Sequence, residues 1–201
     1  KPLVLFTSDN GSYREQSNRP LRGRKGRTDE GGMRVPCIVR WPGKIPAGSS
    51  SELVTSTIDL LPTFAGLAGA EVPGDRIIDG RDIWSILSGK PGAKSPHEVF
   101  CYYQMDQLQA VRSGRWKLFV KLKSKKRNWG KPEGPRPLKL FDLVADIHED
   151  KDVKDKNPLV VKRLLSLVDK VRADLGDMES AGKNQRPAGW VDQPRPRLVE
   201  K

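Results

Sequence analysis

A short apolar segment that ends in a polar corner constrains the fold of this chain more than any other feature. Residues 2–7 read Pro-Leu-Val-Leu-Phe-Thr without polar alternation, and Ser-Asp-Asn-Gly follows at residues 8–11. An unbroken apolar segment predicts a strand that is buried on both faces, which is typical of the interior of a parallel sheet. The next strand candidate, residues 35–41, comes only after about thirty residues. We therefore expect a central strand of an α/β sheet, in a chain that begins in the middle of a larger domain.

Patterns further along the chain predict two well-defined helices. In residues 56–68 a serine precedes apolar side chains at helical spacing, and Pro62 lies near the first turn. Residues 158–175 begin with a proline, carry one apolar face and end before a glycine. Residues 82–87 predict a further short helix. The strand candidates are residues 99–103, 109–111, 116–123 and 138–143, with a hairpin turn at 113–115.

Composition divides the chain near residues 90–97. The 19 Gly and 16 Pro are about a sixth of the 201 residues, which excludes an all-helical bundle. Residues 11–34 are rich in Gly and Arg and are predicted to form an irregular loop that is too polar for the core, and residues 124–137, rich in Lys, Pro and Gly, are predicted to form a long exposed loop. The predicted fold class is α/β, with the remnant of a large mixed sheet and its helices at residues 1–95, a small antiparallel sheet packed by one long helix at 96–178, and an extended tail at 179–201.

No apolar run approaches the roughly 18 residues that span a membrane, so we expect no membrane partner.

The net charge of +12 is concentrated in two places. Residues 112–139 contain eleven Lys and Arg against a single Glu, and residues 14–40 contain eight against three acidic residues. Such clusters favour anionic partners, which include nucleic acid, acidic polysaccharide and sulfate or phosphate esters. The run at 112–139 is either an exosite for sulfated polysaccharide or a surface that only keeps the protein soluble. Charge by itself does not choose among these.

The polar corner after the first strand is a candidate metal site. Asp9 supplies a carboxylate and Asn10 a carbonyl oxygen, both hard donors that suit Ca²⁺ or Mg²⁺. In α/β sheets, ligands gather beyond the carboxyl ends of strands. The alternative is structural, because Asn-Gly is also a favoured hairpin turn.

A second loop places Lys25 among glycines. Residues 21–28 read Leu-Arg-Gly-Arg-Lys-Gly-Arg-Thr, and glycines allow the backbone to approach an anion closely. The ammonium group of a lysine is a compact charge that suits an oxyanion. The alternative is a solvated basic loop.

A series of short motifs extends from Thr7 to Leu143. They are residues 7–11 (TSDNG), 21–26 (LRGRKG), 29–36 (DEGGMRVP), 41–43 (WPG), 59–63 (DLLPT), 79–82 (DGRD), 111–118 (VRSGRWKL) and 140–143 (LFDL). Together, in this order, they resemble the C-terminal half of the type I sulfatases, the group of arylsulfatase A and N-acetylgalactosamine-6-sulfatase. The resemblance implies an α/β fold of the alkaline-phosphatase and sulfatase type, and hydrolysis of aryl or carbohydrate sulfate esters.

The resemblance also implies roles for single residues. Asp9 and Asn10 match the family's late pair of calcium ligands, and Lys25 matches the lysine that contacts the sulfate group. In the family a formylglycine hydrate attacks sulfur while calcium holds the sulfate oxygens. Tyr103 and Gln104 lie between two strand candidates where family members often shape the substrate pocket. The alternative for these two is an ordinary strand end and turn.

The sequence departs from the family in what it lacks. No Cys/Ser-x-Pro-x-Arg signature is present, so the chain contains no nucleophile, and Cys37 and Cys101 are predicted to be core thiols. The family's early aspartate pair and active-site histidines are also missing, and His97 and His148 do not replace them. Two ligands cannot fill the roughly six to eight positions around Ca²⁺. We therefore expect the C-terminal piece of a calcium-dependent sulfatase that is inactive alone, with formylglycine expected upstream.

Two other classes remain as alternatives. A basic module that binds nucleic acid would explain the sequence pI of about 9.9, but no recognisable nucleic-acid motif is present. A module that binds sulfated polysaccharide without catalysis is the other alternative. The resemblance implies a sulfate-ester substrate, including sulfated carbohydrate, and a secreted, periplasmic or lysosome-like location for the whole protein. The natural substrate and the oligomeric state are left open.

Overall fold

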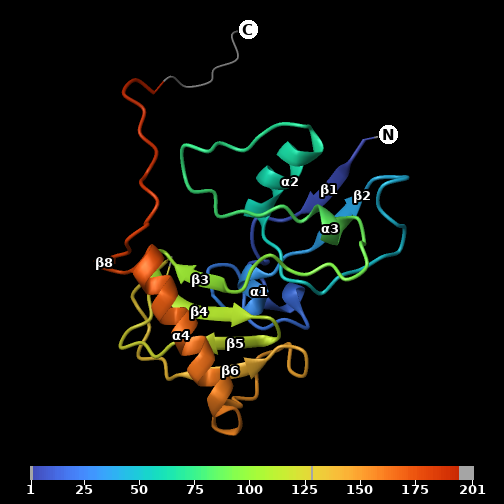
Figure 1. Cartoon of the computed structure of the whole chain (residues 1–201). Coiled ribbons are helices and arrows are strands. Elements are labelled where there is room, and N and C mark those ends of the chain that lie inside the picture. Colours follow the sequence, from blue (N-terminus) through green and yellow to red (C-terminus); the bar gives the residue numbers. More distant parts are fainter. Residues whose placement is uncertain (1, 128, 195–201) are drawn as a thin grey trace.

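The computed structural model describes residues 2–127 and 129–194, so part of the predicted tail, residues 195–201, lies outside the described residues. A four-stranded antiparallel sheet forms its centre, with neighbouring strands in the order β3-β4-β5-β6. These strands are β3 (Phe100–Gln104), β4 (Gln107–Ser113), β5 (Trp116–Phe119) and β6 (Lys139–Asp142). The long helix α4 (Pro158–Leu175) crosses one face of the sheet, as Figure 1 shows. The small antiparallel sheet with one long helix, predicted from the sequence, is confirmed.

Helix α4 forms where its sequence pattern predicts it. Pro158 occupies the first turn, where its missing N–H costs no hydrogen bond, and Gly176 follows the last turn with φ of +87°. Its apolar face packs on the sheet, and the buried core here includes Leu108, Leu118 and Leu140. The helix residues buried in this core are Leu164, Leu167, Val168 and Val171. The predicted bounds of this helix, 158–175, are confirmed.

The strands of the sheet alternate between its two faces. Leu118 in β5 and Leu140 in β6 belong to the core under α4, whereas their neighbours Phe119 and Phe141 belong to a second cluster on the opposite face. Gly114 allows the tight turn between β4 and β5 with φ of +58°. The predicted hairpin at 113–115 is therefore confirmed.

The segment after β5 is more ordered than its composition indicates. Residues 121–127 and 129–137, called here the arm, run out and back with two bridges, Leu122 with Arg136 and Lys125 with Glu133. Lys125 is only 6% exposed. The prediction of an exposed loop at 124–137 is confirmed for most of its described residues, whereas Lys125 is buried because backbone pairing and an ion pair with Glu133 hold the arm together.

The first strand, β1 (Val4–Thr7), does not have the predicted environment. It pairs antiparallel with β2 (Cys37–Arg40), and the side chains of Val4 and Phe6 are 50% and 61% exposed. The prediction of a parallel strand buried on both faces is wrong for the described residues, where β2 alone pairs with it. The predicted burial of Cys37 is wrong for the same reason, since this thiol is exposed on β2. Cys101 on β3 is half-buried, and burial raises the pKa of its thiol to about 11.

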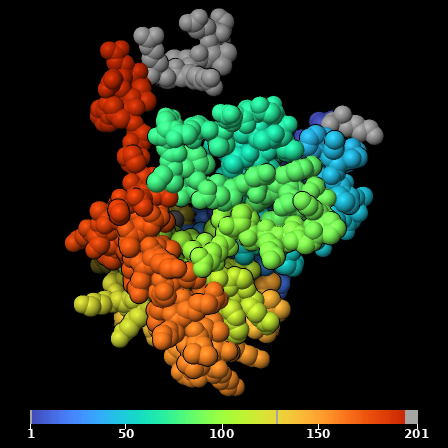
Figure 2. Space-filling model, in the orientation of Figure 1, coloured from blue at the N-terminus to red at the C-terminus, as the bar shows by residue number. Residues whose placement is uncertain are grey.

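Residues 57–87 form a helical part beside the sheet. A 3-10 turn (Thr57–Asp59) leads into α2 (Leu60–Leu67), and α3 (Trp84–Leu87) follows, which confirms both predicted helices. Asp59 is fully buried and accepts hydrogen bonds from the backbone N–H groups of Ser56 and Arg81 at 2.7 and 2.8 Å. His97 Nε2 also lies 2.9 Å from this carboxylate. In the surface view of Figure 2 this part of the chain adjoins the lobe that α4 covers.

The loop between β1 and β2 is partly buried. It includes a 3-10 turn (Glu15–Asn18) and the short helix α1 (Glu30–Met33), which lies on the side of the sheet opposite α4 (Figure 1). Thr28 and Glu30 are at most 1% exposed, so the prediction that this loop is too polar for the core is wrong at residues 28 and 30–32. The remaining elements are a 3-10 turn (Lys154–Lys156), β7 (Gly176–Asp177) and β8 (Ser180–Ala181). Within the described residues, no helix is both long and apolar enough to cross a bilayer.

Candidate functional site

The Asp9–Asn10 corner is held against α1. The backbone N–H of Gly11 donates to the carbonyl of Gly32 at 3.1 Å, and a Cβ atom at Gly11 would lie 1.8 Å from the carbonyl oxygen of Gly31. Only glycine fits there. Asp9 is exposed and Asn10 half-buried. The hairpin alternative for this corner is wrong, because β1 pairs with β2 rather than with the residues that follow Gly11.

The Lys25 loop meets this corner through the backbone. The N–H of Lys25 donates to the carbonyl of Ser12 at 3.0 Å. Gly23 and Gly26 flank the loop with φ of +87° and +79°, which other residues rarely adopt. The side chain of Lys25 is half-buried and has no hydrogen-bond or ion-pair partner among the described residues. The structure therefore brings Lys25 close in space to the chain that leaves Asn10.

Asn18 joins the two loops, and sequence reasoning missed it. Its Oδ1 accepts from the N–H of Ser12 at 2.8 Å, and its Nδ2 donates to the carbonyls of Ser12 and Gly23 at 3.0 Å. Glu15 supports the same loop by accepting from the N–H of Gly23 at 2.9 Å. No motif marks a single asparagine in a basic loop, so the sequence offered no signal for this role.

A cavity of about 520 Å³ lies beside Lys25. The loop and the arm both contribute to its walls, and five of its lining side chains are cationic against one carboxylate, Glu133. The lining residues are Tyr13, Arg24, Lys25, Gly26, Arg27, Lys125, Arg127, Trp129 and Glu133. A cavity of this size and charge suits a small anionic ligand.

Glu133 is shared among three of these cations. Its carboxylate lies 3.2 Å from Lys125, 3.4 Å from Arg27 and 3.5 Å from Arg127. Burial, reinforced by the nearby charge of Arg136, lowers the pKa of Lys125 despite this carboxylate. The cavity therefore holds more positive charge than its own residues neutralise.

A buried ion cluster anchors the loop to the sheet. Lys117 on β5 is fully buried and lies 2.9 Å from Glu30 and 2.8 Å from Glu149. Glu30 also accepts from the Tyr102 hydroxyl at 2.7 Å and from Arg112 at 3.0 Å. The ammonium group of Lys117 further donates to the carbonyl of Thr28 at 2.8 Å. Sequence reasoning missed this cluster because Lys117 and Arg112 read as members of a basic run.

The two carboxyl groups of this cluster have opposite pKa shifts. Burial alone would raise the pKa of Glu30, but Lys117 and Arg112 outweigh it and lower that pKa below its usual value. Burial raises the pKa of Glu149, and Lys117 offsets this effect only in part. Glu149 also accepts from the backbone N–H of Glu30 at 2.8 Å. The cluster thus fixes residues 28–30 to the face of the sheet opposite α4.

Tyr103 and Gln104 do not line the cavity beside Lys25. The Tyr103 ring packs against the core under α4, and its hydroxyl donates to the carbonyl of Gly176 at 2.6 Å. Burial raises the pKa of this hydroxyl to about 12. Gln104 is buried at the end of β3. Their predicted role in a substrate pocket stays a prediction, and the contacts of Tyr103 are those of a structural residue.

The Asp9–Asn10 pair fits calcium by chemistry but is incomplete. A carboxylate and an amide oxygen are donors that Ca²⁺ accepts, yet a full shell needs roughly six to eight oxygens. Among the described residues, no group of three or more His, Cys, Asp or Glu side chains is placed to hold a metal. These two residues can therefore supply only part of such a shell.

Comparisons with known proteins agree with this architecture. The sulfatase family model matches residues 1–70, and the model of the C-terminal region of aryl-sulfatase matches residues 95–194. Mouse (Mus musculus) steryl-sulfatase is 47% identical over 131 residues, covering 58% of this chain and 21% of its own length. N-acetylgalactosamine-6-sulfatase of the dog (Canis lupus familiaris) is 43% identical over 121 residues, with coverages of 57% and 23%.

A solved structure shows the same fold. The PsFucS1 sulfatase from Pseudoalteromonas sp. is 25% identical with a TM-score of 0.71, covering 84% of this chain and 36% of that one. This confirms the α/β fold of the alkaline-phosphatase and sulfatase type. The chain spans about a fifth of the length of these curated relatives. With both of its parts matched by family models, the chain belongs to the sulfatase family.

Proposed function

We propose that this chain forms the sulfate-binding edge and the C-terminal region of a sulfatase that hydrolyses aryl or carbohydrate sulfate esters. Family membership and the convergence of the Lys25 loop on the Asp9–Asn10 corner support this function. The observation that carries it is the hydrogen bond from the Lys25 N–H to the Ser12 carbonyl at 3.0 Å, because it joins the two loops that the proposal needs together.

In this proposal Lys25 binds the sulfate group of the substrate. Lys25 is half-buried, and its ammonium group has no anionic partner among the described residues. It is therefore available to bind one sulfate oxygen and to stabilise the negative charge that grows while the S–O bond breaks. Two positive-φ glycines and Asn18 fix the backbone of the Lys25 loop, so the loop needs little reorganisation when the substrate binds.

Asp9 and Asn10 would hold a calcium ion together with donors from outside the described residues. When bound, the ion supplies positive charge that orients and polarises the sulfate oxygens. The nucleophile, a formylglycine, is likewise proposed to come from another part of the protein, because no Cys/Ser-x-Pro-x-Arg signature occurs in this sequence. Location in a secretory, periplasmic or lysosome-like compartment is part of the same proposal.

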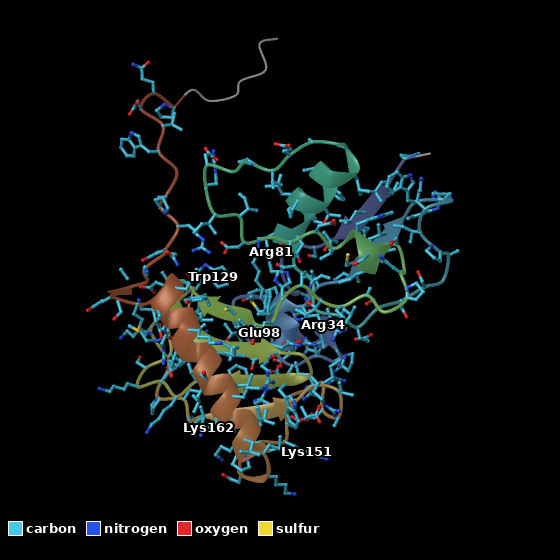
Figure 3. The ribbon with its side chains drawn as sticks, viewed as in Figure 1. Arg34, Arg81, Glu98, Trp129, Lys151 and Lys162 are labelled. Carbon is cyan, nitrogen blue, oxygen red and sulfur yellow. The ribbon has the colours of Figure 1, made fainter. Side chains whose placement is uncertain are left out.

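Substitution of Lys25 tests this function. In the active sulfatase that contains this chain, Lys25→Ala is expected to lower kcat/KM for an aryl sulfate by about 10- to 150-fold, since one charged hydrogen bond contributes about 1.5–3 kcal/mol. Lys162→Ala is the matched control, because Lys162 is an exposed lysine on α4 (Figure 3). An unchanged kcat/KM in Lys25→Ala would remove Lys25 from the sulfate site.

A basic module that binds nucleic acid is less well supported by the structure. Several cations of the run 112–139 have acidic partners from other segments, so they do not form a free basic surface. These pairs are Arg112 and Lys117 with Glu30, Arg115 with Asp142, and Lys126 with Asp106. Five cations instead line the cavity beside Lys25, against the single carboxylate of Glu133.

A further inference from the structure

The arm places an indole ring beside the proposed sulfate lysine. Trp129 (Figure 3) lies over Gly26, where a Cβ atom would come within 2.7 Å of its Cζ3 atom. The residue is nevertheless 58% exposed. A large aromatic side chain left exposed at the wall of a cavity offers a flat surface on which a sugar ring can stack.

The arm also contributes positive charge that nearby carboxylates do not balance. Arg27, Lys125 and Arg127 share the single carboxylate of Glu133, which leaves about two positive charges unmatched before Arg24 and Lys25 are counted. Like charges held this close repel each other, so an anion that binds among them relieves that repulsion. This excess is distinct from the charge of Lys25 itself.

A neighbouring cavity shows that the excess is local. This second cavity, of about 470 Å³, shares Arg27, Lys125 and Glu133 with the first. Its walls also contain Glu15, Asp29 and Glu149, so its positive and negative side chains are nearly balanced. Of these two cavities, the one lined by Lys25 and Trp129 combines a surplus of cations with an exposed aromatic ring.

We propose that the arm forms a subsite for a second anionic group on a saccharide substrate. The sugar ring stacks on Trp129, Lys25 holds the sulfate ester that reacts, and Arg127 with Lys125 binds a further sulfate or carboxylate group of the same saccharide. The preferred substrate class is therefore a sugar with at least two anionic groups. The inference rests on the proposed function, because that function assigns the reacting ester to Lys25.

The size of this half-open cavity favours a saccharide over nucleic acid. Its volume of about 520 Å³ matches a mono- or disaccharide, whereas duplex DNA needs a row of cations along an exposed surface. Lys123 belongs to the same arm and is exposed, but it does not line the cavity. This lysine therefore separates binding in the cavity from binding to general surface charge.

Isothermal titration of the full chain with two sugars tests the subsite. The probes are a disaccharide with two sulfate groups and its counterpart with one. The wild-type chain is expected to bind the disulfated sugar about tenfold more tightly, and Arg127→Gln to remove this preference while changing the affinity for the monosulfated sugar less than about twofold. Trp129→Ala is expected to weaken the binding of both sugars and to leave the binding of inorganic sulfate unchanged.

Lys123→Gln is the matched control, since it removes one charge of the same arm. It is expected to leave the preference intact. If Lys123→Gln weakens binding of the disulfated sugar as much as Arg127→Gln does, general surface charge governs binding and the subsite is excluded. Tighter binding of duplex DNA than of the sugar would exclude the subsite in the same way. No measurable binding of the disulfated sugar would also overturn the inference.

Lys25→Ala in the same titration separates this inference from the proposed function. A loss of preference in Arg127→Gln, with no effect of Lys25→Ala on the monosulfated sugar, supports the anionic subsite and contradicts the sulfate role of Lys25. Weaker binding of both sugars in Lys25→Ala, with the preference intact in Arg127→Gln, contradicts the subsite and supports that role.

Discussion

Charged contacts hold the buried side chain of Glu30. It is 1% exposed, and its carboxylate contacts Lys117, Arg112 and the Tyr102 hydroxyl. Removing one member of a buried ion pair is costly, because the other charge is left without compensation in a region that excludes water. Glu30 is also the first residue of α1, so its loss acts on the segment that carries the Lys25 loop.

We expect Glu30→Gln to lower the free energy of unfolding by about 3–5 kcal/mol near neutral pH. The pKa of Glu30 is lowered in the folded state, so its charge stabilises the fold above the unfolded value of about 4.5, and this stabilisation is lost as the pH falls through the folded pKa. The difference in free energy of unfolding between the variant and the wild type should therefore become smaller below pH 4.5. Denaturant unfolding at several pH values measures this difference.

Glu149→Gln should show the opposite trend with pH. The folded pKa of Glu149 is raised, so its contribution is fully present below about pH 4.5 and is lost as the pH rises through the raised value. Relative to the wild type, this variant should gain stability as the pH rises above 4.5. Glu52→Gln is the control, because Glu52 forms an exposed ion pair with Arg34. A large change in the free energy of unfolding of this variant would contradict the explanation that burial causes the effects at Glu30 and Glu149.

Among the elements, α4 contributes the largest apolar face. One side of this helix and the inner face of β4, β5 and β6 form a single core, and this explains why a purely local pattern predicted the helix correctly. Apolar periodicity over eighteen residues is strong, and the bounding proline and glycine mark both ends. The arm behaves differently, since its order comes from pairing with itself and from Glu133.

Two adjacent leucines on α4 allow a matched test of this core. Leu164 is fully buried and Leu165 is 36% exposed. We expect Leu164→Ala to lower the free energy of unfolding by about 2–5 kcal/mol, through lost burial and the cavity left behind, and Leu165→Ala by less than about 1 kcal/mol. Urea unfolding of both variants checks this. Equal effects would mean that α4 does not pack on the sheet as described.

At the scale of the whole molecule, charge is distributed by the fold rather than by the order of residues. The run 112–139 contains eleven cations, but the fold buries Lys117 between two carboxylates and pairs Arg115 and Lys126 with acidic residues from other segments. Lys125 and Arg127 of this run line a cavity together with three cations of the Lys25 loop. Two basic clusters that are separate in sequence thus form one cationic cavity.

Residues 1–201 are not expected to catalyse sulfate-ester hydrolysis by themselves. With two candidate calcium ligands and no formylglycine signature, residues 1–201 are expected to show no turnover of an activated aryl sulfate above the blank, with or without added Ca²⁺. A colorimetric assay of the purified chain measures this. Turnover well above the blank would show that this chain contains its own nucleophile and would contradict the division of the site proposed here.

The sequence by itself determined the elements with strong local signals. The helix at 158–175, the hairpin around Gly114 and the helix after Ser56 follow from periodicity, capping and turn geometry, all of which act over a few residues. The ordered motifs also identified the family and pointed to Lys25. The roles predicted for Asp9, Asn10, Tyr103 and Gln104 stay predictions.

Only the tertiary structure decided which of these local features meet. The burial of Lys117 against Glu30, 87 residues away in the chain, has no local signal, and neither has the clamp of Asn18 on the Lys25 loop. The exposure of β1 was mispredicted because burial depends on which neighbours cover a strand, not on its own residues. A charge pattern along the chain cannot show where a partner lies in space, and for this reason the cationic cavity emerged only from the fold.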